Sequence, residues 1–472
     1  MISSPDVLTF EALHEESACR LCHFYKNSPY HISDYSIGIK RMWDDLLHTE
    51  YTVANGCLIV RGTVMGRSVF DFPMPIAEEH DVGEALEAMA AYCRRHFLPF
   101  EIINVPGELV STITGRFPHC DVSYRRSHSD YLYETAELAA MAGRGYAGQR
   151  NHIKKFYASY PGAVFRRFEE WDIPAIKRFL RRFASGFAKN SARGARSELE
   201  RAERMIARVG SDCFACGGFE MDGEILSFCL AEICGDMLID HIEKALSEFE
   251  GIYPATVQAF LREFGGGIRY FNREDDASDR GLRMSKLQYR PCEIVHKYSV
   301  KVWNELSPIE RIPELESERL TYDAVRLDDL DAYNRLCLDD ERNRFWGYDY
   351  RVDCPDPDRD YFYLDQKKDF STRSTMTFAI RLDGDLIGEV ILHNFDFRGN
   401  AEIGIRILPE FCGNGYGREA LKTIASYALY TIGLDALHAK CHKENLSSFN
   451  LLSAVMRRCG EDDTYHHFVA TF

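Results

Sequence analysis

The segment that most constrains the fold of this 472-residue chain is a glycine-rich turn near its C-terminus. Residues 400–408 (NAEIGIRIL) are predicted to form a strand and residues 417–432 a helix, with three glycines, Gly413, Gly415 and Gly417, at the junction. This order directs successive backbone N–H groups and the positive end of the helix dipole at one place, where phosphate oxygens bind well. Glycine suits such a turn because a Cβ would block close approach of a diphosphate. The segment predicts a mixed α/β unit with an anion site; an ordinary loop before a helix is the alternative.

The chain divides into three units that each mix helices and strands, which agrees with roughly 100–200 residues per domain. We predict domains at residues 1–124, 125–303 and 319–472, and a linker at 304–318, which carries two prolines and many charges. The pair Asp222–Gly223 predicts a hairpin turn. Other predicted elements include helices at 81–97, 172–187, 253–264, 327–337 and 447–459, and strands at 56–62, 68–74, 100–105, 375–385, 386–395 and 436–443.

Composition and charge exclude several classes of protein. Hydrophobic residues make up 45% of the chain and aromatic residues 12%, which is enough for full cores and excludes wholesale disorder. Lys and Arg number 57 and Asp and Glu 73, so the formal charge is 57 − 73 = −16, which argues against a generic nucleic-acid coat. The sequence has neither a run of about 18 apolar residues nor a basic N-terminus followed by one, so we expect a cytoplasmic protein that is not integral to a membrane.

The 15 cysteines are scattered and mostly lie in apolar segments, which favours reduced, buried thiols over a disulfide framework. Two C-x-x-C spacings, Cys19/Cys22 and Cys213/Cys216, offer four thiolates for zinc. Because the first pair has helical spacing and the second flanks a predicted strand start, we favour structural thiols and expect no metal.

The C-terminal unit resembles the GNAT acyltransferases, and within them the ribosomal-protein N-acetyltransferase-like branch. The resemblance rests on the order of its elements, on the glycine turn and on the later segment AKCHKENLSSFNLLSAVMRRCG. That branch binds coenzyme A pyrophosphate at a Q/R-x-x-G-x-G/A turn, which corresponds here to Cys412–Gly417 with cysteine in place of the leading Arg or Gln. The resemblance implies acetyl-CoA, or another acyl-CoA, as cofactor, bound by Ile407, Leu408, Cys412, Gly413, Asn414, Gly415, Tyr416, Gly417 and Arg418.

The same resemblance implies catalytic residues. Glu402 corresponds to a carboxylate that deprotonates the incoming amine, because only a neutral amine attacks a thioester. Asn445 and Ser448 match an N-x-x-S pattern near the thioester, although Asn and Ser also serve simply as helix caps. Glu389 is a second candidate base. Residues 345–351 (FWGYDYR) resemble the acceptor-side loop, with aromatic side chains that shape a pocket or fill core.

The N-terminal two thirds resemble a second family, the phosphatidylglycerol lysyltransferase C-terminal-like proteins, over about residues 10–298. The matching segments are DYLY at 130–133, GYAGQRNHIKKF at 145–156, HIEKA at 241–245, NREDD at 272–276 and GLRMSKLQYRP at 281–291. The resemblance implies two GNAT-like lobes, so the expected fold is α+β (mixed α/β) with three GNAT-like lobes, each a mixed, mostly antiparallel sheet flanked by helices. Candidate site residues in this module are Arg150, Asn151, Lys154, Glu243, Lys244, Asn272, Arg273, Glu274, Asp275, Arg283 and Lys286.

One stretch contrasts with the acidic total. From Arg144 to Arg208 there are 16 Lys/Arg and 6 Asp/Glu, a local balance of 16 − 6 = +10. Such a stretch suits a phosphate backbone, as in tRNA, or a CoA-type diphosphate; solvated helix faces with ion pairs are the alternative. The polar NREDD segment caps a helix, binds an amine or forms a buried ion network.

We therefore expect an acyl-CoA-dependent N-acyltransferase of the GNAT family. Its acceptor is a small-molecule or peptide amine that the sequence does not identify, and the oligomeric state is not predicted. The alternatives are aminoacyl transfer from charged tRNA by the N-terminal module, whose family includes such enzymes, or a non-catalytic ligand-binding module.

Overall fold

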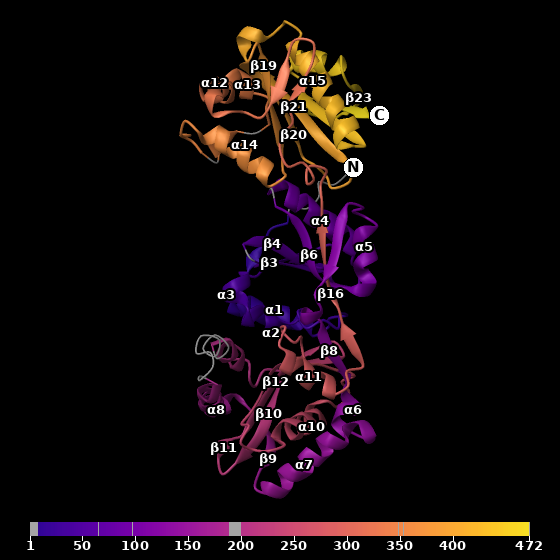
Figure 1. Cartoon of the computed structure of the whole chain (residues 1–472), viewed down its shortest axis with the longest axis vertical. Helices are drawn as coiled ribbons and strands as arrows, with labels where there is room; N and C mark the ends of the chain where they lie inside the picture. The colour runs from indigo at the N-terminus through magenta and orange to yellow at the C-terminus, as the bar shows by residue number, and fades with distance from the viewer. Residues whose placement is uncertain are drawn as a thin grey trace.

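The computed structural model describes residues 8–64, 66–96, 98–187, 200–347, 349–352 and 354–471. It contains three sheets of eight strands, each covered by helices, as expected for a mixed α/β fold (Figure 1). We call each sheet with its helices the first, second or C-terminal lobe. The lobes form a column in which the first lobe lies between the other two.

The first sheet has the strand order β1-β2-β3-β4-β6-β16-β7, and β5 pairs with β3. Its strands are β1 (Glu11–Ala12), β2 (Glu50–Ala54), β3 (Cys57–Val64), β4 (Arg67–Asp71), β5 (Met74–Pro75), β6 (Phe100–Pro106), β7 (Cys120–Tyr124) and β16 (Lys297–Val302). The helices of this lobe are α1 (Glu15–Tyr25), α2 (Ile37–Met42), α3 (Asp44–Leu47), α4 (Val82–Arg95) and α5 (Val110–Thr114).

The second sheet has the order β11-β10-β12-β13-β14-β8-β15, and β9 pairs with β10. Its strands are β8 (Asp130–Glu134), β9 (Val164–Arg167), β10 (Phe214–Met221), β11 (Glu224–Ile225), β12 (Ser227–Cys234), β13 (Met237–Ala245), β14 (Tyr270–Asn272) and β15 (Glu293–Val295). The helices are α6 (Thr135–Ala140), α7 (Ala147–Ser159), α8 (Ile173–Phe187), α10 (Ile252–Phe264) and α11 (Arg280–Gln288).

The third sheet runs β17-β18-β19-β20-β21-β22-β24-β23. Its strands are β17 (Leu315–Glu316), β18 (Thr321–Asp323), β19 (Met376–Leu382), β20 (Asp385–His393), β21 (Asn400–Ile407), β22 (Ala436–His442), β23 (Arg457–Glu461) and β24 (Tyr465–Thr471). The helices are α12 (Leu330–Leu338), α13 (Asp340–Asn343), α14 (Tyr361–Ser371), α15 (Tyr416–Tyr427) and α16 (Leu446–Ser453).

Local sequence signals account for many of these elements. The Asp222–Gly223 turn has the positive φ values, 54° and 81°, that a tight hairpin needs. Helix α4 begins where the Asp81 side chain accepts a hydrogen bond from the Glu84 N–H, as an N-cap does. One prediction was wrong: the late helix was expected to reach Cys459, but α16 ends at Ser453 and residues 457–461 form β23, which pairs with β24.

Two pairings join segments that the sequence assigned to different units. Residues 297–302 were predicted within the second domain, but β16 pairs with β6 and β7 of the first sheet. Residues 315–316 of the predicted linker form β17, which pairs with β18. The first pairing depends on partners more than a hundred residues away, and the second involves a two-residue strand. A local sequence pattern reveals neither. The domain boundaries themselves stay a prediction.

The cores follow the lobes with one exception. A single apolar cluster runs through the first and second lobes and includes Phe397, from the C-terminal lobe, which is buried against Phe100 with ring centroids 5.6 Å apart. Separate clusters fill the C-terminal lobe and the outer face of the second sheet. The first two lobes are therefore one packed module on which the C-terminal lobe rests.

Candidate functional site

Each lobe contains one strand–helix–strand crossover, and in each the two strands are parallel. The units are β4–α4–β6, β13–α10–β14 and β21–α15–β22. The parallel pairing is short in all three, and β21 pairs with β22 only from Asn400 to Glu402 although both strands continue. Because the strands then diverge, the C-terminal sheet has an opening between residues 403–407 and 439–442.

The predicted glycine turn lies at the end of β21, beside this opening. Gly413 and Gly415 have φ values of 81° and 82°, which favour glycine, and Gly415 is the N-cap of α15. In the part of the chain that the structure describes, the N–H groups of Gly413, Asn414 and Gly415 donate to no backbone carbonyl. Together with the first N–H groups of the helix, they form a set of unsatisfied donors suited to an anion.

Two arginines from distant segments flank the turn. Arg319 donates to the Asn414 carbonyl at 3.1 Å and to Glu419 at 2.8 Å, and its guanidinium lies over the Tyr416 ring. Arg342, which is on α13, donates to the Cys412 sulfur at 3.5 Å. Arg342 therefore reaches the position where the related turn carries its own Arg or Gln. Sequence reasoning missed both arginines because no spacing links them to residues 412–417.

The corresponding turns of the other two lobes are unsuited to an anion. The loop before α4 carries Glu78, Glu79 and Asp81, and Asp81 already caps its own helix. The loop before α10 carries Glu248 and Glu250. It ends at Gly251, where a Cβ would lie 2.2 Å from the His152 carbonyl of α7, so α7 covers this helix end. The turn of the third crossover, residues 412–417, differs in that it contains no Asp or Glu and lies beside Arg319 and Arg342.

Glu402 lies at the last position where β21 pairs with β22, and the opening begins there. Its carboxylate is 3.3 Å from the Lys440 ammonium, and His393 is its neighbour on β20. Burial opposes ionisation of Glu402, but the nearby Lys440 and His393 outweigh it and lower the pKa of the carboxyl. Burial, reinforced by Lys440, lowers the pKa of His393, which keeps that imidazole neutral near pH 7. The sequence analysis did not single out Lys440 or His393.

The other predicted C-terminal residues have clear local roles. The Asn445 carbonyl oxygen caps α16 by accepting from the Ser448 N–H at 3.0 Å. The side chains of Ile407 and Leu408 are buried, so these residues face the turn only through their backbone. Arg418 is exposed in the first turn of α15.

Glu389, the second candidate base, is enclosed. It accepts from the Tyr333 hydroxyl at 2.9 Å and from Arg406 Nε at 2.7 Å, and it is buried. The predicted acceptor-side loop does lie over the strand that carries Glu402. Trp346 packs against Gly404 and Arg406, and Phe345 stacks on His442 of β22. Tyr348 of this loop lies outside the described residues.

In the N-terminal module, the predicted residues separate into two groups. The first group forms a buried ion network: Arg273 pairs with Glu243 at 2.7 Å, and the Lys286 ammonium donates to the backbone carbonyls of Arg273 and Asp275. The rest of this group joins through three links, namely Asn272 to Asp130, Glu274 to His241 and Arg283 to Asp276. Burial raises the pKa of Asp275 and lowers that of Lys286.

The second group lies apart from this network. Arg150 donates to the carbonyls of Met141 and Gly143, both at 2.6 Å, and so caps the end of α6. Asn151 and Lys154 are exposed on α7, and Lys244 lies over the Phe183 ring. The structure therefore does not gather all of the predicted residues into one site.

Five cations of the basic stretch pair with acids from elsewhere in the chain. Residues 188–199, with three of its 16 cations, lie outside the described residues. The partners are Glu250 for Lys155, Glu220 for Arg166, Glu263 for Arg167, Glu248 for Arg182 and Asp45 for Arg204. These pairs favour the alternative of solvated, ion-paired faces and weaken the argument for a phosphate backbone from local charge.

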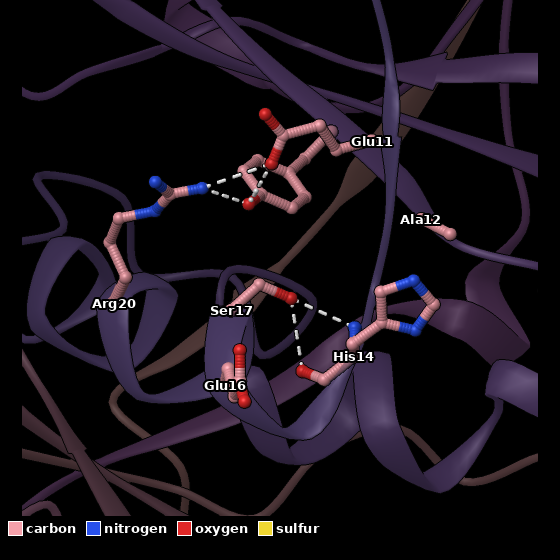
Figure 2. Close-up of a pocket in the computed structure, with 7 residues that line it drawn as sticks. Glu11, Ala12, His14, Glu16, Ser17 and Arg20 are labelled. Atoms are coloured by element: carbon pink, nitrogen blue, oxygen red, sulfur yellow. Dashed lines mark hydrogen bonds and ion pairs between the residues drawn. The ribbon is translucent and has the colours of Figure 1, made fainter.

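The first lobe has an open hollow of about 590 Å³ between β1 and α1 (Figure 2). Its one basic side chain, Arg20, is 3.2 Å from Glu11 and also contacts the Tyr51 hydroxyl, which donates to Glu11 at 2.8 Å. These polar groups satisfy one another, so Arg20 is not free to bind an anionic ligand.

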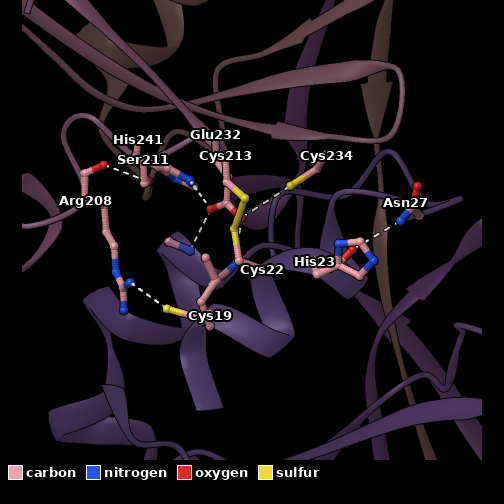
Figure 3. Close-up of a disulfide and its surroundings, with 12 residues drawn as sticks. Cys19, Cys22, His23, Asn27, Arg208, Ser211, Cys213, Glu232, Cys234 and His241 are labelled. Carbon is pink, nitrogen blue, oxygen red and sulfur yellow. Dashed lines mark hydrogen bonds and ion pairs between the residues drawn. A yellow bond between two sulfur atoms is a disulfide. The ribbon is translucent and has the colours of Figure 1, made fainter. Parts of the chain in front are cut away.

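A buried imidazole joins the first two lobes (Figure 3). His241 of β13 lies between Glu232, 3.1 Å from Nε2, and Glu274, 2.8 Å from Nδ1. Glu232 also accepts from the N–H groups of Ile37 and Gly38 in α2, at 3.0 and 2.7 Å. A Cβ on Gly38 would lie 2.3 Å from His241 Nε2, so only glycine lets the helix approach this closely.

The cysteines of the two C-x-x-C pairs lie beside this contact. Cys22 of α1 and Cys213, just before β10, form a disulfide that also joins the two lobes, which corrects the expectation of reduced thiols at these two positions (Figure 3). Cys19 is exposed and contacts Arg208, whereas Cys216 is buried in the core. Among the described residues, no group of three or more His, Cys, Asp or Glu has the arrangement of a metal site.

We expect this imidazole to make stability depend on pH. Burial alone would lower the pKa of His241, but its hydrogen bonds to Glu232 and Glu274 raise it from 6.5 to about 9. Because the pKa of His241 is raised in the folded state, protonation of this imidazole stabilises that state. The stabilisation is complete below pH 6.5 and is lost as the pH rises through 9. Its full size is about 3 kcal/mol.

Urea denaturation of the wild type and of His241→Gln at pH 6.5, 8 and 9.5 measures this dependence. The difference in unfolding free energy between the two proteins is expected to shrink steadily with rising pH. A difference that stays constant across this range would contradict a charged His241.

None of the helices in the described part of the chain combines the length and the apolarity that a membrane crossing requires.

Comparison with known proteins gives two family matches. Residues 25–301 match the family described as phosphatidylglycerol lysyltransferase, C-terminal, and residues 319–460 match the acetyltransferase (GNAT) domain. A conserved protein of unknown function from Bacteroides thetaiotaomicron has a similar structure, with a TM-score of 0.57 and 21% identity over 62% of this chain and 99% of that one. At this identity the likeness shows the fold alone.

Two curated relatives also match. An uncharacterised protein of Mycoplasmoides gallisepticum is 25% identical over 177 residues, 37% of this chain and 57% of the relative. The uncharacterised N-acetyltransferase YnaD of Bacillus subtilis is 29% identical over 82 residues, 17% of this chain and 48% of the relative. The chain thus spans about half the length of each curated relative that it matches.

Proposed function

The chain belongs to the phosphatidylglycerol lysyltransferase C-terminal family and carries a GNAT acetyltransferase domain behind that module, and we propose that it is an acyl-CoA-dependent N-acyltransferase. Its donor site is the glycine turn of the C-terminal lobe. Acetyl-CoA is the proposed donor and an amine is the proposed acceptor. The observation that carries the proposal is the turn of the third crossover, residues 412–417, which contains no Asp or Glu, has N–H groups that make no backbone hydrogen bond among the described residues, and lies beside Arg319 and Arg342.

The residues at the opening suit the transfer step. The diphosphate binds the N–H groups of residues 413–418, and the pantetheine arm enters between β21 and β22, where the strands diverge. The amine nitrogen bonds to the thioester carbon, Glu402 accepts the amine proton directly or through water, and the C–S bond breaks to release the CoA thiolate. An unpaired strand N–H in the opening stabilises the oxyanion. Phe345 and Trp346 form the acceptor side.

Arg342 supplies the cation that Cys412 lacks, and this assignment is testable by rescue. We expect Arg342→Ala to weaken acetyl-CoA binding by about tenfold to a hundredfold, because it removes a charge-assisted contact to the diphosphate. Cys412→Arg in the same chain is expected to restore most of the affinity. Isothermal titration calorimetry on the full chain measures both effects.

Two controls sharpen this test. Arg359→Ala removes an exposed arginine that pairs with Asp331, and it is expected to leave affinity unchanged. Acetyl-pantetheine lacks the diphosphate, so its affinity is expected to be the same in wild type and Arg342→Ala. If acetyl-CoA did not bind the wild-type chain, the proposed function would be wrong. If Arg342→Ala bound acetyl-CoA as tightly as the wild type, only the proposed role of Arg342 would be wrong.

Aminoacyl transfer by the N-terminal module, with tRNA as partner, is the second candidate, and the family match is what favours it. The charge argument for it has weakened, since Arg150 and Lys155 already have partners within the protein. A chain that binds acetyl-CoA but modifies no amine would instead be a ligand-binding module.

A further inference from the structure

A hollow of about 290 Å³ lies at the junction of the first and C-terminal lobes. One wall is formed by the end of α4 and by β6 and β16, and the other by the end of α14 and the loop between β20 and β21. The two lobes are held together here by the buried Phe397 and by an ion pair between Arg398 and Glu87. The hollow is thus enclosed by two parts of the chain that are packed against each other.

The charged side chains that line this hollow are all basic. Three basic side chains line it, Arg94, Lys301 and Arg373, and no Asp or Glu is among its lining residues, although the whole chain has a net charge of −16. Within the described part of the chain, none of the three makes an ion pair with a carboxylate. Arg373 donates one N–H to the Phe370 carbonyl at 2.9 Å, and Lys301 lies over the Trp303 ring.

Hydroxyl and aromatic groups complete the lining. Ser371, Thr372 and Ser374 follow one another around the end of α14, so three hydroxyl groups lie on the same wall as Arg373. Phe100 and Phe397 form an apolar floor and are both buried. Each hydroxyl donates to a backbone carbonyl of Lys368 or Asp369, so the cations are the groups that face an anion. Cations on one side and aromatic rings on the other suit an anion that carries an apolar body.

The backbone around the hollow is held in an uncommon conformation. Arg373, Asn394 and Phe397 have φ values of 64°, 53° and 63°, in the left-handed region that residues with a Cβ seldom adopt. The Asn304 side chain fixes the first of these by donating to the Arg373 carbonyl at 2.5 Å. Such conformations persist only where surrounding contacts enforce them, and they cluster at ligand sites.

We propose that this junction hollow binds a small organic anion, with a phosphate or carboxylate on Arg94, Lys301 and Arg373 and an apolar group on Phe397, which covers the fully buried Phe100. The volume is near the lower end of ligand pockets, which suits a small molecule. The hollow is separate from the donor site, because the loop that lines it precedes β21 and the glycine turn follows that strand. This site does not depend on the proposed acyl transfer.

Calorimetry on the full chain with phenyl phosphate, benzoate, inorganic phosphate and phenol tests the proposal. We expect phenyl phosphate or benzoate to bind with one-to-one stoichiometry, and more tightly than inorganic phosphate and phenol. The tighter binder of phenyl phosphate and benzoate identifies the anionic group that the hollow prefers. Arg94→Gln and Lys301→Gln are each expected to weaken binding at least about tenfold. Arg95→Gln is the matched control, since this exposed neighbour does not line the hollow, and its binding is expected to equal that of the wild type.

Thermal unfolding of each variant establishes that it is folded, and Lys301→Gln provides the test if Arg94→Gln does not fold. Unchanged acetyl-CoA affinity in both variants is expected and separates this site from the glycine turn. The proposal is overturned if neither organic anion binds at millimolar concentration. It is also overturned if phenol binds equally well, or if folded Arg94→Gln and Lys301→Gln bind like the wild type.

Discussion

Glu402→Gln is expected to lower kcat for amine acetylation by about 10² to 10⁴-fold while acetyl-CoA affinity stays unchanged. Glutamine keeps the shape of the side chain but accepts no proton from the amine. The position favours Glu402 over the other candidate base, Glu389, because Glu402 lies where the strands diverge, whereas Glu389 is enclosed by Tyr333 and Arg406. The lowered pKa of Glu402 keeps the carboxylate ionised at neutral pH.

The assay uses a panel of amines, namely a polyamine, an aminoglycoside and a peptide with a free N-terminus, and detects the acetylated product by mass spectrometry. Mass spectrometry is preferable to thiol reagents because thirteen cysteines of the chain are free. Glu410→Gln is the matched control, since it neutralises an exposed carboxylate that pairs with Arg335. If Glu402→Gln kept more than about a tenth of kcat, the base would lie elsewhere, and the neutral His393 would be the next candidate.

The second large effect concerns the contact between the first two lobes. Glu232→Ala is expected to lower the free energy of unfolding by about 3–5 kcal/mol, the usual range when one partner of a buried ion pair is removed. The carboxylate is buried and accepts from His241 and from two N–H groups of α2, so alanine leaves three buried donors without their acceptor. Urea denaturation at pH 7 measures the loss.

Glu224→Ala is the control for this substitution. Glu224 is an exposed carboxylate in the same sheet, and its removal is expected to change stability by no more than about 0.5 kcal/mol. Glu232→Gln, which retains one acceptor oxygen, is expected to lose less than Glu232→Ala. A loss below about 1 kcal/mol for Glu232→Ala would show that the contact does not hold the lobes together.

Much of the fold could be predicted from short stretches of sequence. The mixed α/β class is confirmed, and the strand, glycine turn and helix at residues 400–427 form as expected. The Asp222–Gly223 hairpin and the Asp81 cap also form, because turns and caps depend on side chains within a few residues of one another. The family resemblance extended the prediction to two lobes that composition alone does not reveal.

The candidate site was predictable only in part. The turn at residues 412–417 was found, but its charge comes from Arg319 and Arg342, about 95 and 70 residues earlier. Several cations of the basic stretch have acidic partners elsewhere in the chain, so its net charge by itself does not indicate a ligand. The roles of Glu402, Asn445 and Ser448 in catalysis stay predictions.

The sequence by itself determined the local units, which are the crossover with its glycine turn, the hairpin and the helix caps. Only the tertiary structure decided that β16 returns to the first sheet, that Glu232 links the second lobe to α2 of the first, and that three basic side chains line the junction hollow. The reason is physical. Turns and caps arise from the steric and hydrogen-bonding preferences of neighbouring residues, whereas charge pairing and strand partnership depend on which distant surfaces the whole chain brings into contact.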